Sequence, residues 1–244
     1  MSGEPWFLVD PLPAVGPYVL DGPEGRHAAT VRRLRPGESL VLTDGRGGRV
    51  DATVSSAGRS ELTLDIGTVT RVPGPDLRIT LVQALPKGDR NELAVDLATE
   101  AGVDALVPWQ AERCVARWSG DKAVRGAEKW RVVAREAAKQ SRRPFLPRVS
   151  ELATTVDVVE LIGHADGGLI LHEASAAPIA AATLPTRGDL VLVVGPEGGI
   201  TPTELAALTA AGGQLVRLGP EVLRTSTAGA VALGALGGRT GRWS

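Results

Sequence analysis

The sequence is poor in the residues that build disulfide and metal sites. Its 244 residues include one cysteine, Cys114, and three histidines, His27, His164 and His172. A single cysteine excludes an internal disulfide and any zinc site that needs several thiolates, and the histidines are not spaced as a metal cluster. We therefore expect no metal centre, and we interpret Cys114 as a small buried residue rather than a reactive thiol.

Long apolar segments are missing as well. The two longest uncharged runs, 174–186 and 225–238, fall short of the roughly 18 apolar residues that span a bilayer. The first residues have no basic stretch followed by an apolar one, so no export signal is predicted. The content of 43% hydrophobic and 23% charged residues is typical of a globular chain. We expect a soluble, cytoplasmic protein with no membrane partner.

The chain also lacks a strong net charge, but its charges are unevenly distributed. The net charge is −1, and residues 1–72 are near neutral, with eight arginines and nine acidic residues. Residues 115–148 carry ten basic side chains against three acidic ones, a local excess of seven positive charges. Such an excess attracts a polyanion at long range. A solvated helix surface is the equally weighted alternative.

The first 72 residues are predicted to form a small β-barrel. Short apolar runs, Ser39–Thr43, Gly48–Val54 and Glu61–Ile66, are separated by Asp-Gly, Gly-Gly and Ala-Gly pairs that favour turns. The Val-Pro-Gly-Pro stretch at 72–75 cannot continue a strand ladder and is typical of a linker. We therefore place a domain boundary there.

Residues 76–244 are predicted to form an α/β domain around a parallel sheet, because apolar strands alternate with helical segments. Within the helix expected over 127–140, Trp130, Val133, Ala134 and Ala137 share one face, and Arg131, Arg135 and Lys139 form a neighbouring basic stripe. The predicted strands are Leu77–Ala84, Asp104–Pro108, Gly168–His172, Leu190–Val194 and Gln214–Leu218.

The sharpest local feature is a glycine-rich loop, 195–200, between a buried strand and a helix. Thr201 is expected to cap that helix, with Pro202 at its first position and Glu204 completing a capping box. Glycines let a backbone approach a ligand closely at the carboxyl end of a parallel strand. A tight turn that needs glycine for geometry alone is the alternative. The loop matches neither a Walker loop nor a dinucleotide fingerprint.

Two further strand exits, meaning segments that directly follow a strand, are expected beside this loop. One is 218–228, where Thr225 or Ser226 is predicted to cap a helix that runs through Leu236; the other is Leu171–Glu173. The exits offer backbone groups and few nucleophiles, a pattern that favours binding and positioning a small polar molecule over covalent catalysis. For His172 we prefer a local hydrogen bond to a catalytic role.

Several stretches together resemble one family, the RsmE 16S ribosomal RNA uridine-N3 methyltransferases. The similarity extends upstream through Arg26 and His27 and residues 31–38 to that family's PUA-like RNA-binding barrel, so it covers nearly the whole chain. The stretches are LVQALPKGD at 81–89, ATEAGVDALVP at 98–108, REAAKQSRR at 135–143, LVVGPEGGITPTE at 192–204 and RLGPEVLRTSTAG at 217–229.

The resemblance implies a fold, a partner and a cofactor. The fold is a SPOUT-type parallel sheet with a trefoil knot at 76–244, preceded by a PUA-like barrel at 1–72. The partners are a second copy of the chain, as a homodimer, and 16S rRNA in the small subunit. The cofactor is S-adenosylmethionine, held by Leu171, His172, Glu173, Gly195, Pro196, Glu197, Gly198, Gly199, Ile200, Leu218, Gly219, Leu223, Arg224 and Thr225.

The chain departs from the family pattern at two positions. Lys139 stands where the family often has Glu, and we expect its charge to strengthen RNA attraction. Ser226 stands where the family often has an acidic residue, so no catalytic role of that acid is carried over.

Catalysis at uridine N3 needs the N3 anion, which a cationic group stabilises. Arg224 is the first candidate for that role, Arg143 is a second candidate on the RNA side, and no general base stands out, although Glu197 is one option. The residues expected to bind RNA are Arg26, Arg32, Arg33, Arg35, Lys87, Arg131, Arg135 and Arg143. The alternatives are a SPOUT methyltransferase for another RNA or atom, and a non-catalytic RNA-binding assembly factor.

Overall fold

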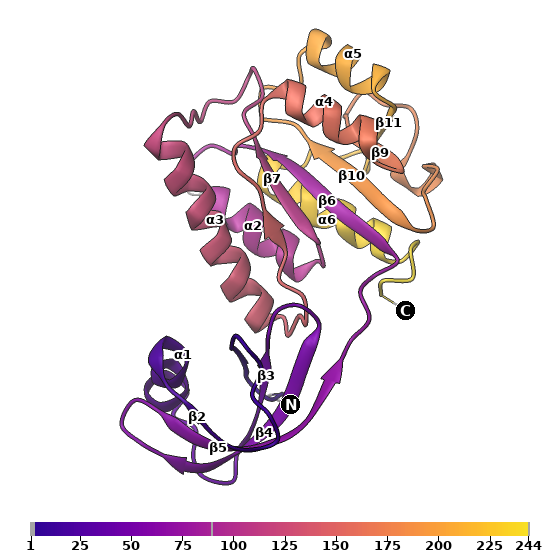
Figure 1. Cartoon of the computed structure of the whole chain (residues 1–244). Coiled ribbons are helices and arrows are strands. Elements are labelled where there is room, and N and C mark those ends of the chain that lie inside the picture. Colours follow the sequence, from indigo (N-terminus) through magenta and orange to yellow (C-terminus); the bar gives the residue numbers. More distant parts are fainter. Residues whose placement is uncertain (1–2, 89, 244) are drawn as a thin grey trace. The chain divides into compact units, whose positions relative to one another are not determined.

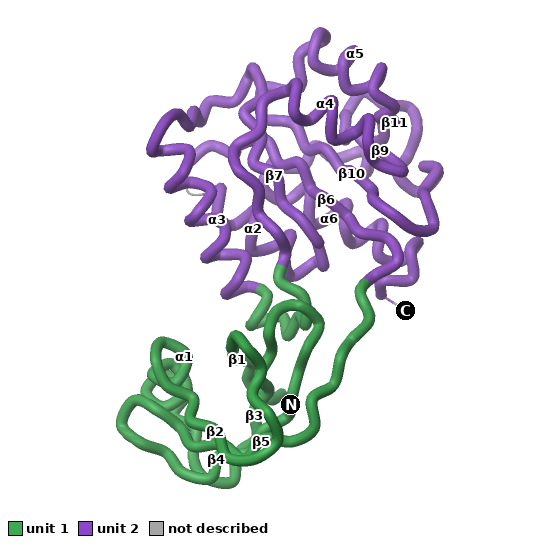
Figure 2. The backbone as a smooth tube through the Cα atoms, in the orientation of Figure 1, with its two compact units in different colours: residues 1–74, 138–146 green, residues 75–137, 147–244 purple. Residues whose placement is uncertain are grey.

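The computed structural model describes residues 3–88 and 90–243 (Figure 1). The chain forms two compact units, shown in different colours in Figure 2. Unit 1 comprises residues 1–74 and 138–146, and unit 2 comprises residues 75–137 and 147–244. Sequence analysis assigned residues 138–146 to the α/β segment, whereas in the structure they belong to the unit built from the N-terminal strands.

Unit 1 is a five-stranded sheet wrapped around its own apolar core. Along β4, alternate residues Val50, Ala52 and Val54 are buried while Asp51 and Thr53 face outward, as expected for a strand with one covered face. The sheet order is β1-β3-β4-β5-β2, and only the β1–β3 pair is parallel. The elements are β1 (Trp6–Leu8), β2 (Gly16–Leu20), α1 (Gly22–Arg26), a π-helical turn (His27–Val31), β3 (Ser39–Thr43), β4 (Gly48–Ala57) and β5 (Leu62–Arg71).

A buried ion pair joins two distant segments of unit 1. The Lys139 ammonium donates to Glu24 Oε1 at 2.8 Å, and the two side chains are 4% and 11% exposed. A buried charge is costly unless it is paired, so this contact fixes the end of the long helix α3 against α1. The expectation that the Lys139 charge adds to RNA attraction is therefore wrong, because that charge is buried and neutralised.

Unit 2 is built on a six-stranded parallel sheet of order β11-β9-β10-β6-β7-β8. The central strand β10 (Gly188–Val194) is buried on both faces along its last five residues, which explains its continuous apolar sequence. The other strands are β6 (Leu77–Ala84), β7 (Ala105–Trp109), β8 (Arg148–Val149), β9 (Gly167–Leu171) and β11 (Gly213–Val216). The five strands expected from sequence in this unit are all present: β6 has the expected bounds, and the ends of the other four differ by at most two residues.

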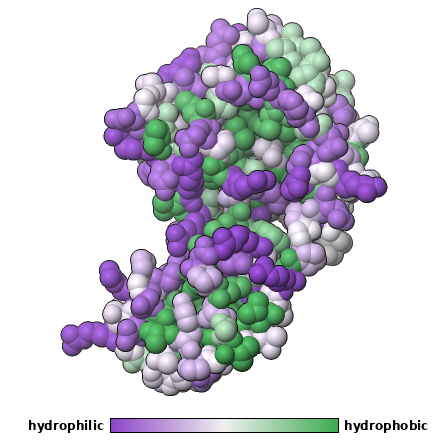
Figure 3. All heavy atoms as spheres, in the orientation of Figure 1, coloured by the Kyte–Doolittle hydropathy of each residue, from purple (hydrophilic) through white to green (hydrophobic). Residues whose placement is uncertain are grey.

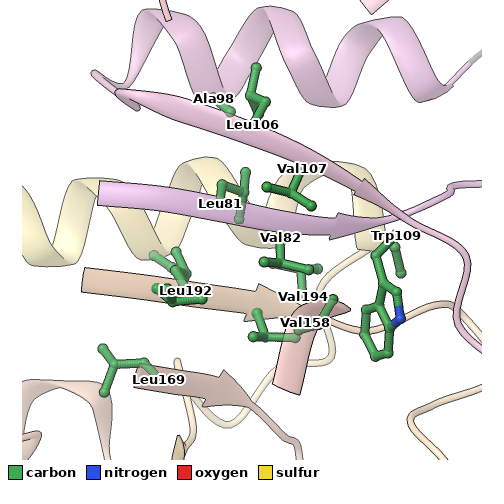
Figure 4. Packing of buried hydrophobic residues seen from close by; sticks show 14 of the residues in the cluster. Leu81, Val82, Ala98, Leu106, Val107, Trp109, Val158, Leu169, Leu192 and Val194 are labelled. Carbon is green, nitrogen blue, oxygen red and sulfur yellow. The ribbon is translucent and has the colours of Figure 1, made fainter. Parts of the chain in front are cut away.

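Helices cover both faces of this sheet (Figure 1). Helices α2 (Arg90–Glu100) and α6 (Thr225–Gly237) pack together on one face, and α4 (Thr155–His164) and α5 (Pro202–Ala210) lie on the other. Figure 4 shows side chains from β6, β7, β9 and β10 meeting those of α2 and α4 in one core. Gly229 lets α6 approach the sheet, because a Cβ there would lie 2.8 Å from Leu81 Cδ2.

Helix α3 (Asp121–Gln140) begins six residues earlier than the sequence pattern indicates. Its buried face contains Trp130, Ala134 and Ala137, as expected. The Trp130 ring packs edge-to-face on Trp118, with 5.7 Å between ring centroids. The sequence before residue 127 shows a weaker apolar period, so the first turns of the helix were missed.

The surface is of mixed polarity, with hydrophilic and hydrophobic residues interspersed on the face seen in Figure 3. Within the residues that the structure describes, none of the helices combines the length and the apolar character that a bilayer crossing requires.

Candidate functional site

The main cavity of unit 2 lies where β9, β10 and β11 end and α6 begins. It has a volume of about 680 Å³, in the range of small-molecule sites. All fourteen residues that the resemblance assigns to the donor line this one cavity, although they come from three segments of the chain. The carboxyl ends of parallel strands meet at one edge of a sheet, so the topology brings these segments together.

The glycine-rich loop forms one wall of the cavity, and close packing explains its glycines. A Cβ on Gly198 would lie 3.2 Å from Arg113 Cβ and 3.4 Å from the Arg113 carbonyl oxygen. Gly199 has a φ of +75°, in the left-handed region that other residues adopt at a cost. The Arg113 guanidinium donates to the Gly198 carbonyl at 3.1 Å and so holds the loop from outside.

A capping box fixes the point where the loop becomes α5, as the sequence predicts. The Thr201 side chain accepts from the Glu204 N–H, and the Glu204 carboxylate accepts from the Thr201 N–H. The same buried carboxylate accepts from the Glu112 N–H and the Thr155 hydroxyl, both at 2.9 Å. Burial alone raises the pKa of Glu204, but these hydrogen bonds outweigh it and hold the pKa below its usual value.

We expect Glu204→Gln to destabilise unit 2 by about 2–3 kcal/mol at pH 7, because an amide cannot accept all the hydrogen bonds that the carboxylate accepts. A lowered folded-state pKa gives stability that is present above the unfolded pKa of about 4.3 and is lost as pH falls through the folded value. Urea unfolding at several pH values should therefore show the gap to wild type closing below about pH 4. Glu160→Gln, at an exposed position on α4, is the control, and a pH-independent gap would contradict the assignment.

The start of α6 forms a second wall of the cavity. Arg224 is the N-cap, with no side-chain capping bond, so the prediction that Thr225 or Ser226 caps the helix is wrong. The reason is a long-range contact: the buried Gln83 side chain on β6 donates to the Thr225 carbonyl at 3.2 Å and sets where the helix starts. Ser226 is buried, and its hydroxyl has no hydrogen-bond partner among the described residues.

The cavity carries charges of both signs. Its basic residues are Arg113, Arg217 and Arg224, and its acidic residues are Glu173, Glu197 and Glu221. Within the part of the chain that the structure describes, the Arg224 guanidinium has no hydrogen-bond or ion-pair partner. His172 Nδ1 accepts from the Ala174 N–H at 3.3 Å, which agrees with the local role expected for it.

Sequence reasoning missed Arg113 as a cavity residue. It lies in the loop after β7, and none of the glycine-bearing exits signals its presence. Of the other lining residues, Val194 and Arg217 lie directly beside predicted ones, and Pro220, Glu221, Val222 and Ala228 lie inside the predicted exit 218–228. The packing of β7 beside β6, which in turn pairs with β10, brings the loop that contains Arg113 to the edge of the sheet where the cavity lies, and this tertiary contact cannot be read from local sequence.

The residues expected to bind RNA fall into both units. Arg26, Arg32, Arg33, Arg35 and Arg143 belong to unit 1, and Lys87, Arg131 and Arg135 belong to unit 2. The backbone N–H of Lys87 lies 3.4 Å from Glu197 Oε1, beside the cavity. Arg131 is bound by Glu128 at 3.1 Å and Glu151 at 2.5 Å, and these hydrogen bonds raise its pKa. The guanidinium therefore stays charged but is already paired with two carboxylates.

The remaining candidate chemistry is limited. Cys114 is buried, as expected, and burial raises the pKa of its thiol. Across residues 3–88 and 90–243, no three histidine, cysteine or acidic side chains gather in a way that could hold a metal ion.

Two family models match this chain. Residues 73–237 match an RNA methyltransferase domain, and residues 20–67 match an RNA methyltransferase PUA domain. A ribosomal RNA small subunit methyltransferase E from Mycobacterium bovis is 52% identical over 242 residues, covering 97% of this chain and 92% of the relative. One of the same name from Bacillus subtilis is 30% identical and covers 91% of this chain and 90% of the relative.

Solved structures agree with these relatives. A ribosomal RNA small subunit methyltransferase E from Neisseria gonorrhoeae, bound to S-adenosylmethionine, superimposes with a TM-score of 0.84 at 29% identity, covering 97% of this chain and 98% of the other. A methyltransferase from Legionella pneumophila with bound S-adenosylmethionine gives a TM-score of 0.86 at 27% identity, with the same coverage. The expected fold class, a parallel α/β domain preceded by a PUA-like domain, is confirmed.

Proposed function

We propose what this chain does from the premise that it belongs to the family of ribosomal RNA small subunit methyltransferase E. It transfers a methyl group from S-adenosylmethionine to N3 of a uridine in 16S rRNA. Methylation of small-subunit rRNA rests on family membership. The choice of uridine N3 rests on the sequence resemblance. The observation that carries the site assignment is the 680 Å³ cavity lined by every residue that the resemblance assigns to the donor.

The residues of the cavity fit this donor. The glycines at 195 and 198 let the loop backbone pack closely against Ile200 and Arg113, so that backbone groups of the loop line the cavity where a ligand can contact them. Glu173, Glu197 and Glu221 bring negative charge to a cavity that has to hold a sulfonium cation. Leu171, Ile200 and Leu218 offer apolar contacts for an adenine ring. When bound, S-adenosylmethionine supplies an electrophilic methyl group.

The chain's own residues prepare the acceptor. Uridine N3 carries a proton and becomes nucleophilic only as that proton leaves, so a group that stabilises the N3 anion lowers the barrier. In the balanced reaction the N3 proton passes to solvent water, the N3–C bond forms, and the S–C bond breaks to release S-adenosylhomocysteine. We assign anion stabilisation to Arg224, whose guanidinium is exposed in the cavity and bound to no other described group.

The RNA is assigned to basic residues of both units. In unit 1 these are Arg26, Arg32, Arg33, Arg35 and Arg143, and in unit 2 they are Lys87 and Arg135, with a smaller share for the ion-paired Arg131. Arginine side chains suit phosphate because the planar guanidinium donates two parallel hydrogen bonds.

The proposal includes a knotted, homodimeric protein of the cytoplasm that uses no metal. The knot and the homodimer rest on the sequence resemblance to the family. Full activity of a variant held as a monomer would contradict the dimer.

The test is transfer of tritium from labelled S-adenosylmethionine to small ribosomal subunits that lack the modification. We expect label in 16S rRNA, and nucleoside analysis should recover it as 3-methyluridine. Label on another nucleoside would keep the methyltransferase and overturn the acceptor. Failure of the folded protein to bind either S-adenosylmethionine or S-adenosylhomocysteine in calorimetry would favour a non-catalytic RNA-binding factor.

A further inference from the structure

Unit 1 brings together two basic segments that lie more than 100 residues apart in sequence. Residues 26–35 contain four arginines, and residues 139–143 contain Lys139, Arg142 and Arg143; neither segment contains an acidic residue. The rest of unit 1 holds four arginines and nine acidic residues, so the basic character of this unit is concentrated in these two segments.

A small cavity joins the two segments. His27 and Arg32 line it from the first segment, Lys139, Gln140 and Arg142 line it from the second, and residues 3–7, which include one acidic residue, Glu4, close it. Its volume of about 50 Å³ is room for three or four water molecules. A phosphate group is of that size, whereas a nucleobase is larger.

Two arginines, Arg32 and Arg142, line this cavity. Elsewhere in the unit, Arg46, Arg49 and Arg71 lie within 4 Å of Asp10, Asp51 and Asp44. In the described part of the chain, the guanidinium groups of Arg26, Arg32, Arg33, Arg35 and Arg142 have no such acidic partner. The two of these arginines that line the cavity, Arg32 and Arg142, can therefore bind an anion there.

Two of these arginines occupy backbone positions that favour glycine. Arg33 has a φ of 53° and Arg142 a φ of 55°, and they are the only residues other than glycine with positive φ in the described chain. Each follows the end of a helical segment: the Leu34 N–H donates to the Ala28 carbonyl at 3.1 Å, and the Arg143 N–H donates to the Ala138 carbonyl at 2.9 Å. Glycine adopts this conformation at lower cost, so the arginine side chains work against stability.

The helix end beside the cavity does not repel an anion through free carbonyls. The Arg142 N–H donates to the Lys139 carbonyl at 3.2 Å, so the turn pairs carbonyls at the end of α3. Lys139 is held by Glu24, so the guanidinium groups of Arg32 and Arg142 are the cations of the lining that an anion can use. The Arg142 guanidinium packs against Gly3, where a side chain would overlap it.

We propose that this cavity binds a backbone phosphate of the RNA substrate through Arg32 and Arg142, with Arg33 as a further phosphate contact. The inference rests on the proposed function, since it takes RNA as the substrate. It adds a binding site in unit 1 to the donor cavity in unit 2, and it predicts that two arginines lower stability while raising RNA affinity.

The test is the pair of variants Arg33→Gly and Arg142→Gly. Each should unfold at the same temperature as wild type or about 2–4 °C higher, because glycine relieves the left-handed conformation. Each should bind a 16S rRNA transcript about fivefold more weakly and lose about one unit from the slope of log affinity against log salt. The control Arg71→Gly removes a charge from ordinary backbone at the end of β5, and should unfold earlier and bind the transcript as wild type does.

The outcomes separate this proposal from the proposed function. Unchanged transcript affinity in both variants overturns the phosphate site and leaves the methyltransferase intact. If the variants bind small ribosomal subunits more weakly but bind the transcript as wild type does, the phosphate site is also overturned, and the surface would be assigned to a ribosomal protein. A wild-type protein that binds S-adenosylhomocysteine but no RNA overturns the RNA substrate and this site together. Weaker transcript binding with unchanged S-adenosylhomocysteine affinity supports the site.

Discussion

The Gly198→Val variant should bind S-adenosylhomocysteine at least about 100-fold more weakly than wild type, a loss of about 2.7 kcal/mol. The valine Cβ would lie 3.2 Å from Arg113 Cβ and 3.4 Å from the Arg113 carbonyl oxygen, and its two methyl groups extend further. Arg113 can shift only if the whole loop after β7 shifts with it. We therefore expect the clash to push residues 195–200 into the cavity. Titration calorimetry measures the affinity directly.

Two further variants make the Gly198 result specific. Gly198→Ala requires a shift of only a few tenths of an ångström, and we expect a loss of severalfold. Gly163→Val adds the same side chain on α4, where a Cβ meets no atom within 4 Å, and should leave binding unchanged. Wild-type affinity in Gly198→Val would show that the donor does not contact this loop, while equal losses in Gly198→Val and Gly163→Val would point to general unfolding.

The features that sequence reasoning predicted well depend on short-range pattern. The capping box at Thr201 and Glu204 needs only residues three apart, and the structure confirms it. The strand Leu190–Val194 is recognisable because both of its faces are buried, and β6 is found with its bounds unchanged. Because parallel strands end at one sheet edge, the three strand exits also predicted which residues line one cavity.

The features that it missed depend on partners far away in the chain. The basic stripe places Lys139 on a solvated face, but Glu24, 115 residues away, buries and neutralises it. The start of α6 involves Gln83, 142 residues from Thr225, and the local cap signals at Thr225 and Ser226 are not used. Arg113 reaches the cavity through the packing of β7 beside β6. Residue spacing in one sequence contains no information about such contacts.

Replacement of Arg224 is expected to slow methyl transfer by about 100- to 1,000-fold in kcat, the range seen when a donor to a developing anion is removed. The effect on folding should be small, because α6 depends on the Arg224 backbone: its carbonyl accepts from the Thr227 and Ala228 N–H groups at 2.9 and 3.0 Å, and alanine keeps that carbonyl. Single-turnover tritium transfer measures the rate, and calorimetry measures separately any loss of S-adenosylhomocysteine affinity, since Arg224 also lines the donor cavity.

A dependence on substrate acidity distinguishes anion stabilisation by Arg224 from a structural role. The N3–H of 5-fluorouridine is more acidic than that of uridine, so the formation of its anion depends less on stabilisation by a cation. The defect of Arg224→Ala should therefore shrink on RNA that contains 5-fluorouridine, and it should shrink on ordinary RNA as pH rises. Arg187→Ala, which removes an exposed arginine of unit 2 from outside the cavity lining, should react at the wild-type rate. A defect of the same size on both RNAs and at every pH would mean that Arg224 positions the RNA and does not stabilise the uridine anion.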